Sequence, residues 1–572
     1  MKRRGGAMED MVAKLGITPG FARILCGRGF DTVEKASAYL YPDSAELTPA
    51  AALPDAERFC AFLFQARELG QRVRIIGDYD ADGVTSTYIM LSALKRFGIE
   101  ADYRIPNRVT DGYGISADMV REAKADNVQV IITVDNGIAA VSQIALAKEL
   151  QITVLITDHH EPQEVLPKAD AIVDFKCHSD YPGSAVCGCV VAGKLMDMLL
   201  SKDGKPGFFL ENVEIFALAT VSDVMELSGE NRTIVRMGLS KPVSEWNMGL
   251  RKLVEANHLK TEPKAYSLGF VLAPCINAFG RLASADPGVS LLLETDEREA
   301  FKLAASMVDA NSLRKDLTVR SIKAATTALD PHRSEGDYPI VYLAEECHES
   351  IAGIVAGKLR ERYYLPSIVL CRSTEDPGLL KGSGRSVEGY SIFDGLQACG
   401  ELFERFGGHA QACGLSIREE KLSEFRSRLT EHYQKAGIEA VEKITIDLVV
   451  NFSDVTKELI SEIGRMEPFG AGNQRPVFAA RNVTLVKLSH FGRTVRYTRM
   501  SFKDESNQYV NAVYFGDADE IITEMKLVWG EETVTAAYAG RGKSLMHILF
   551  TPQISSYNSE VEIILDHYQL LQ

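Results

Sequence analysis

The chain has 572 residues, 46% of them hydrophobic and 25% charged, and its formal net charge is −15 at pH 7. This composition is close to that of globular proteins and excludes a disordered or fibrous chain. The length predicts about three or four domains, and the apolar runs fall far short of the roughly 20 residues that a membrane span needs.

The N-terminal segment and the cysteines indicate the compartment. Met1–Arg4 is basic, but Glu9 and Asp10 follow before any apolar segment, so we expect no export signal and a cytoplasmic protein. The ten cysteines lack CxxC spacing, which predicts reduced structural thiols instead of a zinc site. The negative charge alone argues against a nucleic-acid partner. A metal-dependent phosphoesterase, however, gathers carboxylates around its cations and needs only a local basic groove for a single strand.

A parallel sheet is predicted after a helical N-terminal region of residues 1–69. Four apolar, β-rich runs each precede a polar or glycine-rich stretch and a helix-like segment: Val73–Gly77, Val128–Val134, Ile152–Thr157 and Ala171–Val173. Strands buried on both faces that alternate with helices are typical of a parallel α/β sheet. Ligands bind beyond the carboxyl ends of such strands, and the acidic residues lie there.

The first acidic cluster, in IIGDYDADGVTST, contains Asp78, Asp80 and Asp82. Three carboxylates in one short loop repel one another unless cations compensate them. An Asp-rich turn or a helix cap is the structural alternative, because capping needs only one oxygen acceptor. An EF-hand fits poorly, since neither the twelve-residue loop nor its bidentate Glu follows.

Three further motifs follow in chain order. Asp135 comes directly after a strand in IITVDNGI, although Asp-Asn-Gly is also a common turn. Asp158, His159 and His160 end the next strand in LITDHHEP, and such groups are good ligands for Mn²⁺, Zn²⁺ or Fe. Asp223 interrupts an apolar run in ALATVSDVMEL, where a lone carboxylate needs a partner. Together the motifs predict a dinuclear Mn²⁺ or Mg²⁺ centre with one bridging carboxylate.

The middle of the chain predicts a helical connector and a second α/β domain. Residues 286–329 are mostly helical, either as one long helix or as a helical pair. We then expect a strand, a helix, a strand and glycine-rich loops, the first three at Ile340–Ala344, Ile351–Tyr363 and Ser367–Leu370. The helix near Ile351 is placed to aim its N-terminus at a phosphate.

Two glycine-rich motifs in this domain are candidate anion sites. In GSGRS the glycines let backbone N–H groups approach an anion, Ser383 donates a hydrogen bond and Arg385 offers a planar fork. GGHA gives His409 a similarly open setting. A plain tight turn is the alternative for either motif.

After about Ile444 short alternating segments, including Arg493–Phe502 and Tyr509–Phe515, predict a small β-barrel. Its first hairpin arm combines basic and aromatic residues that suit a single strand: Arg493, Arg496, Tyr497, Arg499 and Phe502. The aromatic residues are equally compatible with the barrel core.

These motifs carry a family resemblance. DYDADG, VDNG, DHH and SDVMEL, in this order over about residues 70–230, resemble the motifs of the DHH phosphoesterases. NAFGRL at 277–282 extends the match, while GSGRS at 382–386 and FGGHAQACG at 406–414 are similar to the DHHA1 substrate domain. PFGAGNQRPVF at 468–478 resembles the start of the OB-fold in RecJ-type exonucleases.

The resemblance implies roles for individual residues. Metal ligands would be Asp80, Asp82, Asp135, His159 and Asp223, with Asp135 as the bridge. His160 would face the scissile phosphate, while Asp78 and Asp158 would be ligands or would orient the imidazoles. Arg108 and Arg281 are further anion-binding candidates by resemblance.

The expected fold class is α/β, with a DHH parallel-sheet domain (70–285), a helical connector (286–335), a DHHA1 domain (336–440) and an OB-like barrel (441–572). The resemblance implies a 5′-to-3′ exonuclease that uses two divalent cations, Mn²⁺ or Mg²⁺, to convert single-stranded DNA into 5′-mononucleotides during recombination and repair. The expected partners are a helicase and a single-stranded-DNA-binding protein. No association with a membrane is expected.

Two other functions fit the sequence less well. A DHH enzyme for short oligoribonucleotides, a nucleotide bisphosphate or pyrophosphate is typically shorter and lacks the OB region. A non-catalytic binding module would have lost ligands, and here none is missing. The sequence does not distinguish RNA from DNA as the substrate.

Overall fold

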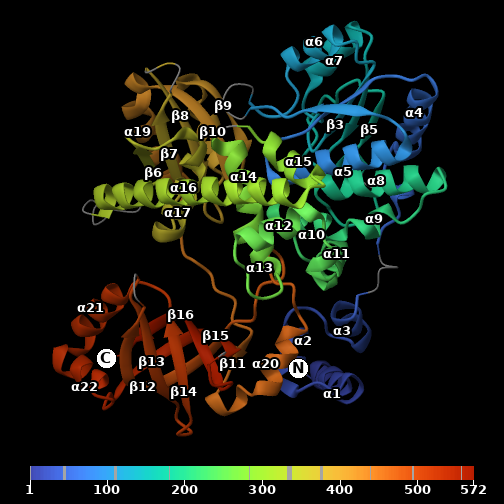
Figure 1. The fold of residues 1–572 in the computed structure, drawn as a ribbon. Helices are drawn as coiled ribbons and strands as arrows, with labels where there is room; N and C mark the ends of the chain where they lie inside the picture. The colour runs from blue at the N-terminus through green and yellow to red at the C-terminus, as the bar shows by residue number, and fades with distance from the viewer. Residues whose placement is uncertain are drawn as a thin grey trace. The chain divides into compact units, whose positions relative to one another are not determined.

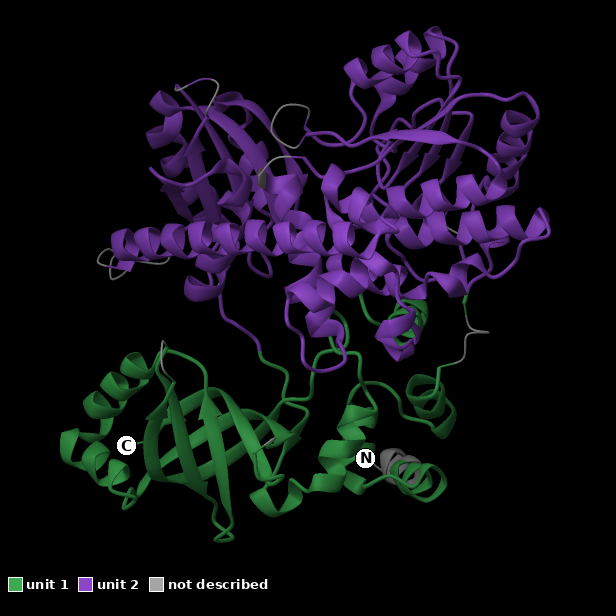
Figure 2. Cartoon of the chain, in the orientation of Figure 1, with its two compact units in different colours: residues 1–47, 226–236, 444–572 green, residues 48–225, 237–443 purple. Residues whose placement is uncertain are grey.

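The computed structural model describes residues 2–42, 47–107, 112–178, 181–282, 284–330, 338–373, 376, 378–438, 440–492, 495–555 and 557–571. The chain divides into two compact units (Figure 2). The larger contains residues 48–225 and 237–443, and the smaller contains residues 1–47, 226–236 and 444–572. Over the described ranges, none of the helices combines the length and apolar character needed to cross a membrane.

A five-stranded parallel sheet forms the first half of the larger unit, in the order β2-β1-β3-β4-β5. Its strands are β1 (Val73–Ile76), β2 (Ala101–Arg104), β3 (Val130–Val134), β4 (Thr153–Thr157) and β5 (Ala171–Val173). The four apolar runs are therefore strands, as predicted. The edge strand β2 was not predicted, because its sequence ADYR is short and only half-buried and contains no apolar run.

Helices cover both faces of this sheet (Figure 1). They are α4 (Ala56–Glu68), α5 (Ala81–Phe97), α6 (Ala117–Ala125), α7 (Val141–Glu149) and α8 (Gly188–Lys202). Two more helices, α9 (Phe208–Glu211) and α10 (Val213–Ser222), pack on α8, and α10 also packs on α5. α6 and α7 pack on one face, where Val120 and Ile144 join Ile131 of β3 in one core. α5 and α8 lie on the other face. This arrangement leaves the carboxyl ends of the strands free for a site.

A helical region follows the sheet. Its elements are α11 (Gly229–Ser240), α12 (Met248–Ala256), α13 (Ala265–Ser267), the π-helix η5 (Leu268–Leu272), α14 (Ala273–Leu282), α15 (Asp286–Leu293) and α16 (Glu297–Leu329). The expected connector is thus a short helix and one helix of 33 residues. Asp296 caps α16, because its side chain accepts hydrogen bonds from the N–H groups of Arg298 and Glu299.

A second five-stranded sheet, in the order β6-β7-β8-β10-β9, completes the larger unit. Its elements are β6 (Ile340–Leu343), α17 (Ala352–Tyr363), β7 (Ser367–Arg372), β8 (Leu379–Arg385), α18 (Ile392–Gln397), β9 (Phe403–His409), β10 (Ala412–Arg418) and α19 (Leu422–Ala436). The expectation of loops or tight turns at the glycine-rich motifs was wrong, because GSGRS lies in β8 and FGGH in β9. A Cβ on Gly382 would lie 2.5 Å from Leu370 Cδ2, so close strand packing requires glycine there.

The C-terminal part of the smaller unit is a closed β-barrel, as predicted. Its elements are β11 (Leu448–Val449), α20 (Lys457–Gly464), β12 (Phe478–Phe491), β13 (Tyr497–Lys503), β14 (Tyr509–Tyr514), α21 (Ala518–Trp529), α22 (Glu531–Tyr538), β15 (Ser544–Ile554) and β16 (Val561–Leu570). The long strand β12 pairs with β13 on one side and with β15 on the other, and this double pairing closes the barrel.

The two ends of the chain share one hydrophobic core. The N-terminal helices are α1 (Lys2–Leu15), α2 (Pro19–Gly27) and α3 (Val33–Leu40). Phe21 and Leu25 are fully buried in the same cluster as Phe478 of the barrel. Glu462 Oε1 accepts a hydrogen bond of 2.7 Å from the Thr18 N–H group. The N-terminal helices are therefore part of the barrel unit, which the sequence did not predict.

Candidate metal centre

The loop between β1 and α5, together with the first turn of α5, supplies three carboxylates, those of Asp78, Asp80 and Asp82. Asp80 caps α5, since its Oδ1 accepts a hydrogen bond of 3.0 Å from the Gly83 N–H group. Asp82 lies in the first turn of α5, and its two oxygens accept from the N–H groups of Gly188 (2.7 Å) and Cys189 (3.0 Å) at the start of α8. These two hydrogen bonds hold the carboxylate in one orientation. The N-terminus of α8 also stabilises its negative charge.

Asp135 follows the last residue of β3 and is buried in the centre of the cluster. Its backbone is left-handed, with φ of 60°. The Tyr113 hydroxyl donates a hydrogen bond of 3.1 Å to the Asp135 carbonyl. The start of α8 lies close to this carboxylate, and only glycine fits at position 188. A Cβ there would lie 2.8 Å from Asp135 Oδ1.

Asp158, at the end of β4, is buried, and both of its carboxylate oxygens accept hydrogen bonds. Oδ2 accepts from the Ile138 N–H group (2.9 Å), and Oδ1 accepts from that of His159 (2.8 Å) and lies 2.7 Å from His160 Nδ1. Burial raises the pKa of Asp158, but the hydrogen bond from His160, the charge of both histidines and the Ile138 N–H group together outweigh burial and leave the pKa below its usual value. Asp158 therefore orients His160.

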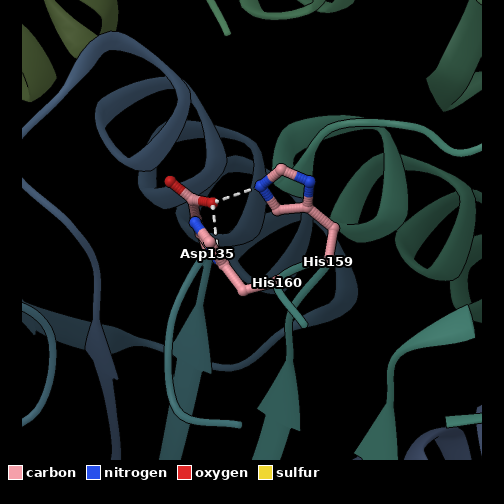
Figure 3. A group of neighbouring side chains, drawn as sticks. All are labelled: Asp135, His159 and His160. Carbon is pink, nitrogen blue, oxygen red and sulfur yellow. Dashed lines mark ion pairs between the residues drawn. The ribbon is translucent and has the colours of Figure 1, made fainter. Parts of the chain in front are cut away.

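His159 lies at the meeting point of three carboxylates. Its Nε2 is 3.1 Å from Asp135 Oδ1, 3.7 Å from Asp82 Oδ2 and 3.7 Å from Asp223 Oδ2. Figure 3 shows His159 and His160 directed toward Asp135 from the neighbouring strand end. Asp223 ends α10 and is followed by Val224, whose φ of 56° is rare for a β-branched residue.

The ligand atoms form three overlapping groups, within each of which all atoms lie within 4.8 Å of one another. The groups are Asp135 with His159 and His160, Asp82 with His159 and Asp223, and Asp78 with Asp80 and Asp135. Asp135 and His159 each belong to two of the groups. Of the two, Asp135 is the candidate bridge, because a carboxylate has two oxygen atoms that can each bind a cation.

Unsatisfied atoms show that divalent cations fit this cluster. Among the described residues, Asp78 Oδ1, Asp135 Oδ1 and His159 Nε2 are buried without a hydrogen-bond partner. Burial and the neighbouring carboxylates raise the pKa of Asp78 and of Asp135 well above its usual value. A buried group of this kind is stable only when cations compensate it, and oxygen ligands with an imidazole suit Mn²⁺ or Mg²⁺.

Three residues that support the cluster were not predicted. The Tyr113 hydroxyl lies 3.1 Å from His160 Nδ1. Asn136 joins the ends of β1 and β3, because its Nδ2 donates to the carbonyls of Ile76 (3.0 Å) and Val134 (2.9 Å). Asn277 Oδ1, on α14, accepts a hydrogen bond of 2.7 Å from the N–H group of Ala81. Asn136 and Asn277 lie inside the motifs VDNG and NAFGRL. These motifs were the sequence features from which the two supporting residues could have been predicted.

Most phosphate-binding candidates gather around the start of α17. Arg385 Nη1 donates to Ser383 Oγ (3.3 Å), and a Cβ on Gly353 would lie 2.8 Å from the same Oγ. Arg281 Nη1 donates to the Ser350 carbonyl (2.9 Å), just before this helix. The N-terminus of α17 is thus beside two arginines, which favours an anion.

His409 lies in the same row of the second sheet as Arg385. Both residues pair with Ala412, Arg385 from β8 and His409 from β9. Neighbouring strands are about 4.8 Å apart, so the two Cα atoms lie about 10 Å from each other. Arg108 lies outside the described residues.

The basic and aromatic candidates of the barrel differ in their contacts and in their exposure to solvent. Tyr497 begins β13, and its ring lies 5.7 Å from that of Phe491, whose face also carries the Arg499 guanidinium at 5.0 Å. Arg496 forms an exposed ion pair of 3.4 Å with Asp519. Arg493 lies outside the described residues. Phe502 is fully buried, so the core alternative holds for this residue and base stacking is excluded.

Comparisons with known proteins agree with this architecture. Residues 72–220 match the DHH family, N-terminal domain, residues 336–435 the DHHA1 domain and residues 446–567 the RecJ OB domain. The larger unit therefore contains the DHH and DHHA1 domains, and the barrel is the OB domain. These matches confirm the expected fold class.

Named relatives and a solved structure were also found. The chain is 35% identical over 505 residues to the single-stranded-DNA-specific exonuclease RecJ of Bacillus subtilis, covering 88% of this chain but 63% of that protein. It is 32% identical over 502 residues to the Escherichia coli exonuclease of the same name, covering 83% and 85%. The crystal structure of RecJ in complex with Mn²⁺ from Thermus thermophilus superposes with a TM-score of 0.82 at 26% identity, covering 99% of this chain and 78% of that chain. The chain belongs to the RecJ family of single-stranded-DNA-specific exonucleases, within the DHH phosphoesterases.

Proposed function

We propose that the chain is a metal-dependent exonuclease that degrades single-stranded DNA from its 5′ end to 5′-mononucleotides in recombination and repair. The observation that carries this proposal is the convergence of Asp82, Asp135 and His159, with unsatisfied buried atoms, at the strand ends of a DHH sheet. Family membership supports the choice of substrate.

Six residues would hold two divalent cations, Mn²⁺ or Mg²⁺: Asp78, Asp80, Asp82, Asp135, His159 and Asp223. Asp135 would bridge, because it alone joins the Asp78 and Asp80 carboxylates to the histidines. Bound cations of this kind lower the pKa of a water molecule and polarise the phosphate.

His160 would contact the scissile phosphate. Burial lowers its pKa, but the Asp158, Asp223 and Asp82 carboxylates together outweigh this effect and raise the pKa to about 9. In its protonated form the imidazole would donate a hydrogen bond to a phosphate oxygen. Asp158 would fix the ring through the 2.7 Å contact with Nδ1, and the Tyr113 hydroxyl lies 3.1 Å from the same atom.

A second phosphate of the strand would lie at the start of α17. Arg281, Ser383 and Arg385 would donate hydrogen bonds to it, since they lie near this helix end. His409, two strands away from Arg385, and Arg108 are further candidates. Binding a phosphate at a fixed separation from the metal centre would select a strand end over an internal bond. The barrel would hold the rest of the strand through Arg496, Tyr497 and Arg499, together with Arg493.

Partners and location follow from this substrate. A helicase would supply the single strand, and a single-stranded-DNA-binding protein would cover it. The enzyme would then act in the cytoplasm, where bacterial DNA is found.

Digestion of end-labelled substrates tests the proposal. Single-stranded DNA, duplex DNA and RNA, labelled at either end, are incubated with Mn²⁺, Mg²⁺ or a chelator. We expect rapid release of labelled mononucleotide from 5′-labelled single-stranded DNA, and no release with the chelator. Equal activity on duplex DNA would contradict the substrate assignment. Cleavage confined to dinucleotides or nucleotide bisphosphates would favour the small-substrate alternative.

A further inference from the structure

Two aromatic side chains outside the metal centre face solvent together. Tyr266 is 68% exposed and Phe270 is 66% exposed. Their rings stack on each other with centroids 4.9 Å apart and planes at 22°. Soluble proteins normally bury side chains of this size, so an ordered, exposed pair indicates a surface that binds something.

The local backbone holds both rings on one side. Tyr266 is in α13, and Phe270 is one turn later in η5. η5 is a π-helix, a form that is rare and frequent at functional sites. The buried side chains of Leu268 and Leu272 anchor the segment, so the aromatic rings are displayed from a packed support.

The segment before the pair is basic. His258, Lys260 and Lys264 are exposed, and Glu262 is the one acidic residue between His258 and Phe270. This contrasts with the net charge of −15 of the whole chain. Exposed aromatic rings beside cations are the combination that binds single-stranded nucleic acids, because bases stack on the rings and phosphates attract the cations.

The pair is linked to the metal centre through α10. A Cβ on Gly269, between Tyr266 and Phe270, would lie 3.0 Å from Val221 Cγ1. Val221 is two residues before the candidate ligand Asp223, so η5 packs on the end of the helix that presents this carboxylate. Figure 1 shows α13 next to α10 and α12 in the helical region.

We propose that Tyr266 and Phe270 form a stacking platform for bases of single-stranded DNA, with Lys260 and Lys264 attracting its backbone. The platform holds the strand beside the end of α10 and contributes affinity without reading sequence, because every base has a face that can stack. This inference rests on the proposed nuclease function. It adds a strand-binding element within the larger unit, separate from the OB barrel.

Binding of base-bearing and abasic strands tests the platform. Fluorescence anisotropy with a labelled thymidine strand of about 16 nucleotides, and with an abasic strand of the same length, is measured in the full chain with a chelator present. The variants are the double substitution Tyr266→Ala, Phe270→Ala, the conservative Phe270→Trp, and Tyr338→Ala as a control at another exposed tyrosine of the larger unit. Because both rings are exposed, the circular dichroism melting curve should not change.

One stacked base contributes a factor of roughly 5 to 150 to affinity. We therefore expect the double variant to bind the thymidine strand at least about tenfold more weakly and the abasic strand like the wild type, with Phe270→Trp and Tyr338→Ala unaffected. Unchanged thymidine binding would overturn the platform and leave the pair as a protein-docking surface. An equal loss on both strands would also overturn it. Wild-type digestion of single strands is measured separately, so failure of the nuclease function is distinguishable from failure of the platform.

Discussion

Asp135 shows how the surrounding residues maintain an unfavourable conformation at the metal centre. A left-handed backbone is uncommon for a residue other than glycine, and it persists only where neighbours fix it. The Asp135 N–H group donates to the Thr157 carbonyl (3.0 Å), and the Asp135 carbonyl accepts from Tyr113 (3.1 Å). Both contacts direct the carboxylate toward His159 instead of along the strand.

Replacing the Asp135 carboxylate should stabilise the metal-free chain. Burial and neighbouring carboxylates raise the pKa of Asp135, so its ionised form destabilises the fold at neutral pH. Asp135→Asn mimics the protonated form. We expect a higher unfolding temperature than wild type with a chelator at pH 7, and a smaller difference as the pH falls and the wild-type group is protonated.

Adding Mn²⁺ to the same two proteins measures how much metal binding stabilises each of them. Each ion should stabilise the wild type by about 2.7 kcal/mol at roughly 100 times its dissociation constant, and Asp135→Asn should lose most of that gain. Calorimetry with and without Mn²⁺ measures both effects. A Mn²⁺ gain of wild-type size in the variant would remove Asp135 from the metal site.

Arg385 should matter for strand binding and not for metal binding. Charge-assisted hydrogen bonds are worth roughly 1.5 to 3 kcal/mol, so Arg385→Ala should reduce kcat/KM on 5′-phosphorylated strands by more than about tenfold. The control Arg362→Ala removes an exposed arginine from the other end of α17. Mn²⁺ titration should give the same stoichiometry in both variants. Wild-type kinetics in Arg385→Ala would disprove the phosphate assignment.

At the scale of elements, the sequence predicted the strands that a local apolar pattern marks. Apolar runs gave β1, β3, β4 and β5, and the acidic residues lie at their carboxyl ends. β2 was missed because an edge strand needs no apolar run. β8 and β9 are strands where the sequence predicts loops, because glycines that allow close strand packing are indistinguishable in sequence from glycines of a turn.

The support of the metal loop could not be predicted, because it comes from distant segments of the chain. Asn277 is 196 positions from Ala81, and its contact with the Ala81 N–H group depends on how α14 packs. Tyr113 and Gly188 reach the cluster in the same way. Each of these contacts exists only in the folded chain.

Asn277→Ala should lower activity while the chain stays folded. It leaves the Ala81 N–H group without its acceptor and loosens the loop with Asp78 and Asp80, so we expect at least about a tenfold fall in kcat, corresponding to roughly 1.4 kcal/mol. Asn257→Ala is the control, because it removes side-chain hydrogen bonds to the Leu253 carbonyl and to Cys275 of α14 without touching Ala81. Equal activity of the two variants at equal stability would show that Asn277 is only structural.

At the scale of the molecule, the chain ends depend on each other. α2 buries Phe21 and Ile24 in the core of the barrel unit, and Arg28 pairs with Asp447 at 2.7 Å. Contacts between residues more than 400 positions apart leave no local pattern, so the N-terminal region was predicted only as helical. Truncation after Lys443 would therefore uncover the apolar face of α2 as well as remove the barrel.

Phe21→Ala tests this dependence in the full chain. A buried phenylalanine replaced by alanine costs about 3 to 5 kcal/mol. We expect the barrel unit to unfold at lower denaturant concentration, as reported by protease sensitivity within residues 444–572. Tyr557→Ala, at a 96% exposed position of the same unit, should be neutral. Unchanged protection of the barrel in Phe21→Ala would contradict the shared core.

The most direct test of the central claim is the single-turnover rate at which 5′-labelled single-stranded DNA is hydrolysed by Asp135→Ala in saturating Mn²⁺. Loss of the bridging ligand should cost several kcal/mol of transition-state stabilisation, which lowers the rate about a thousandfold or more while circular dichroism shows a folded chain. Asp118→Ala, at an exposed carboxylate of the same domain, should keep the wild-type rate. A folded Asp135→Ala chain that hydrolyses the strand within about tenfold of wild type, in a Mn²⁺-dependent way, would contradict a catalytic metal centre at this position.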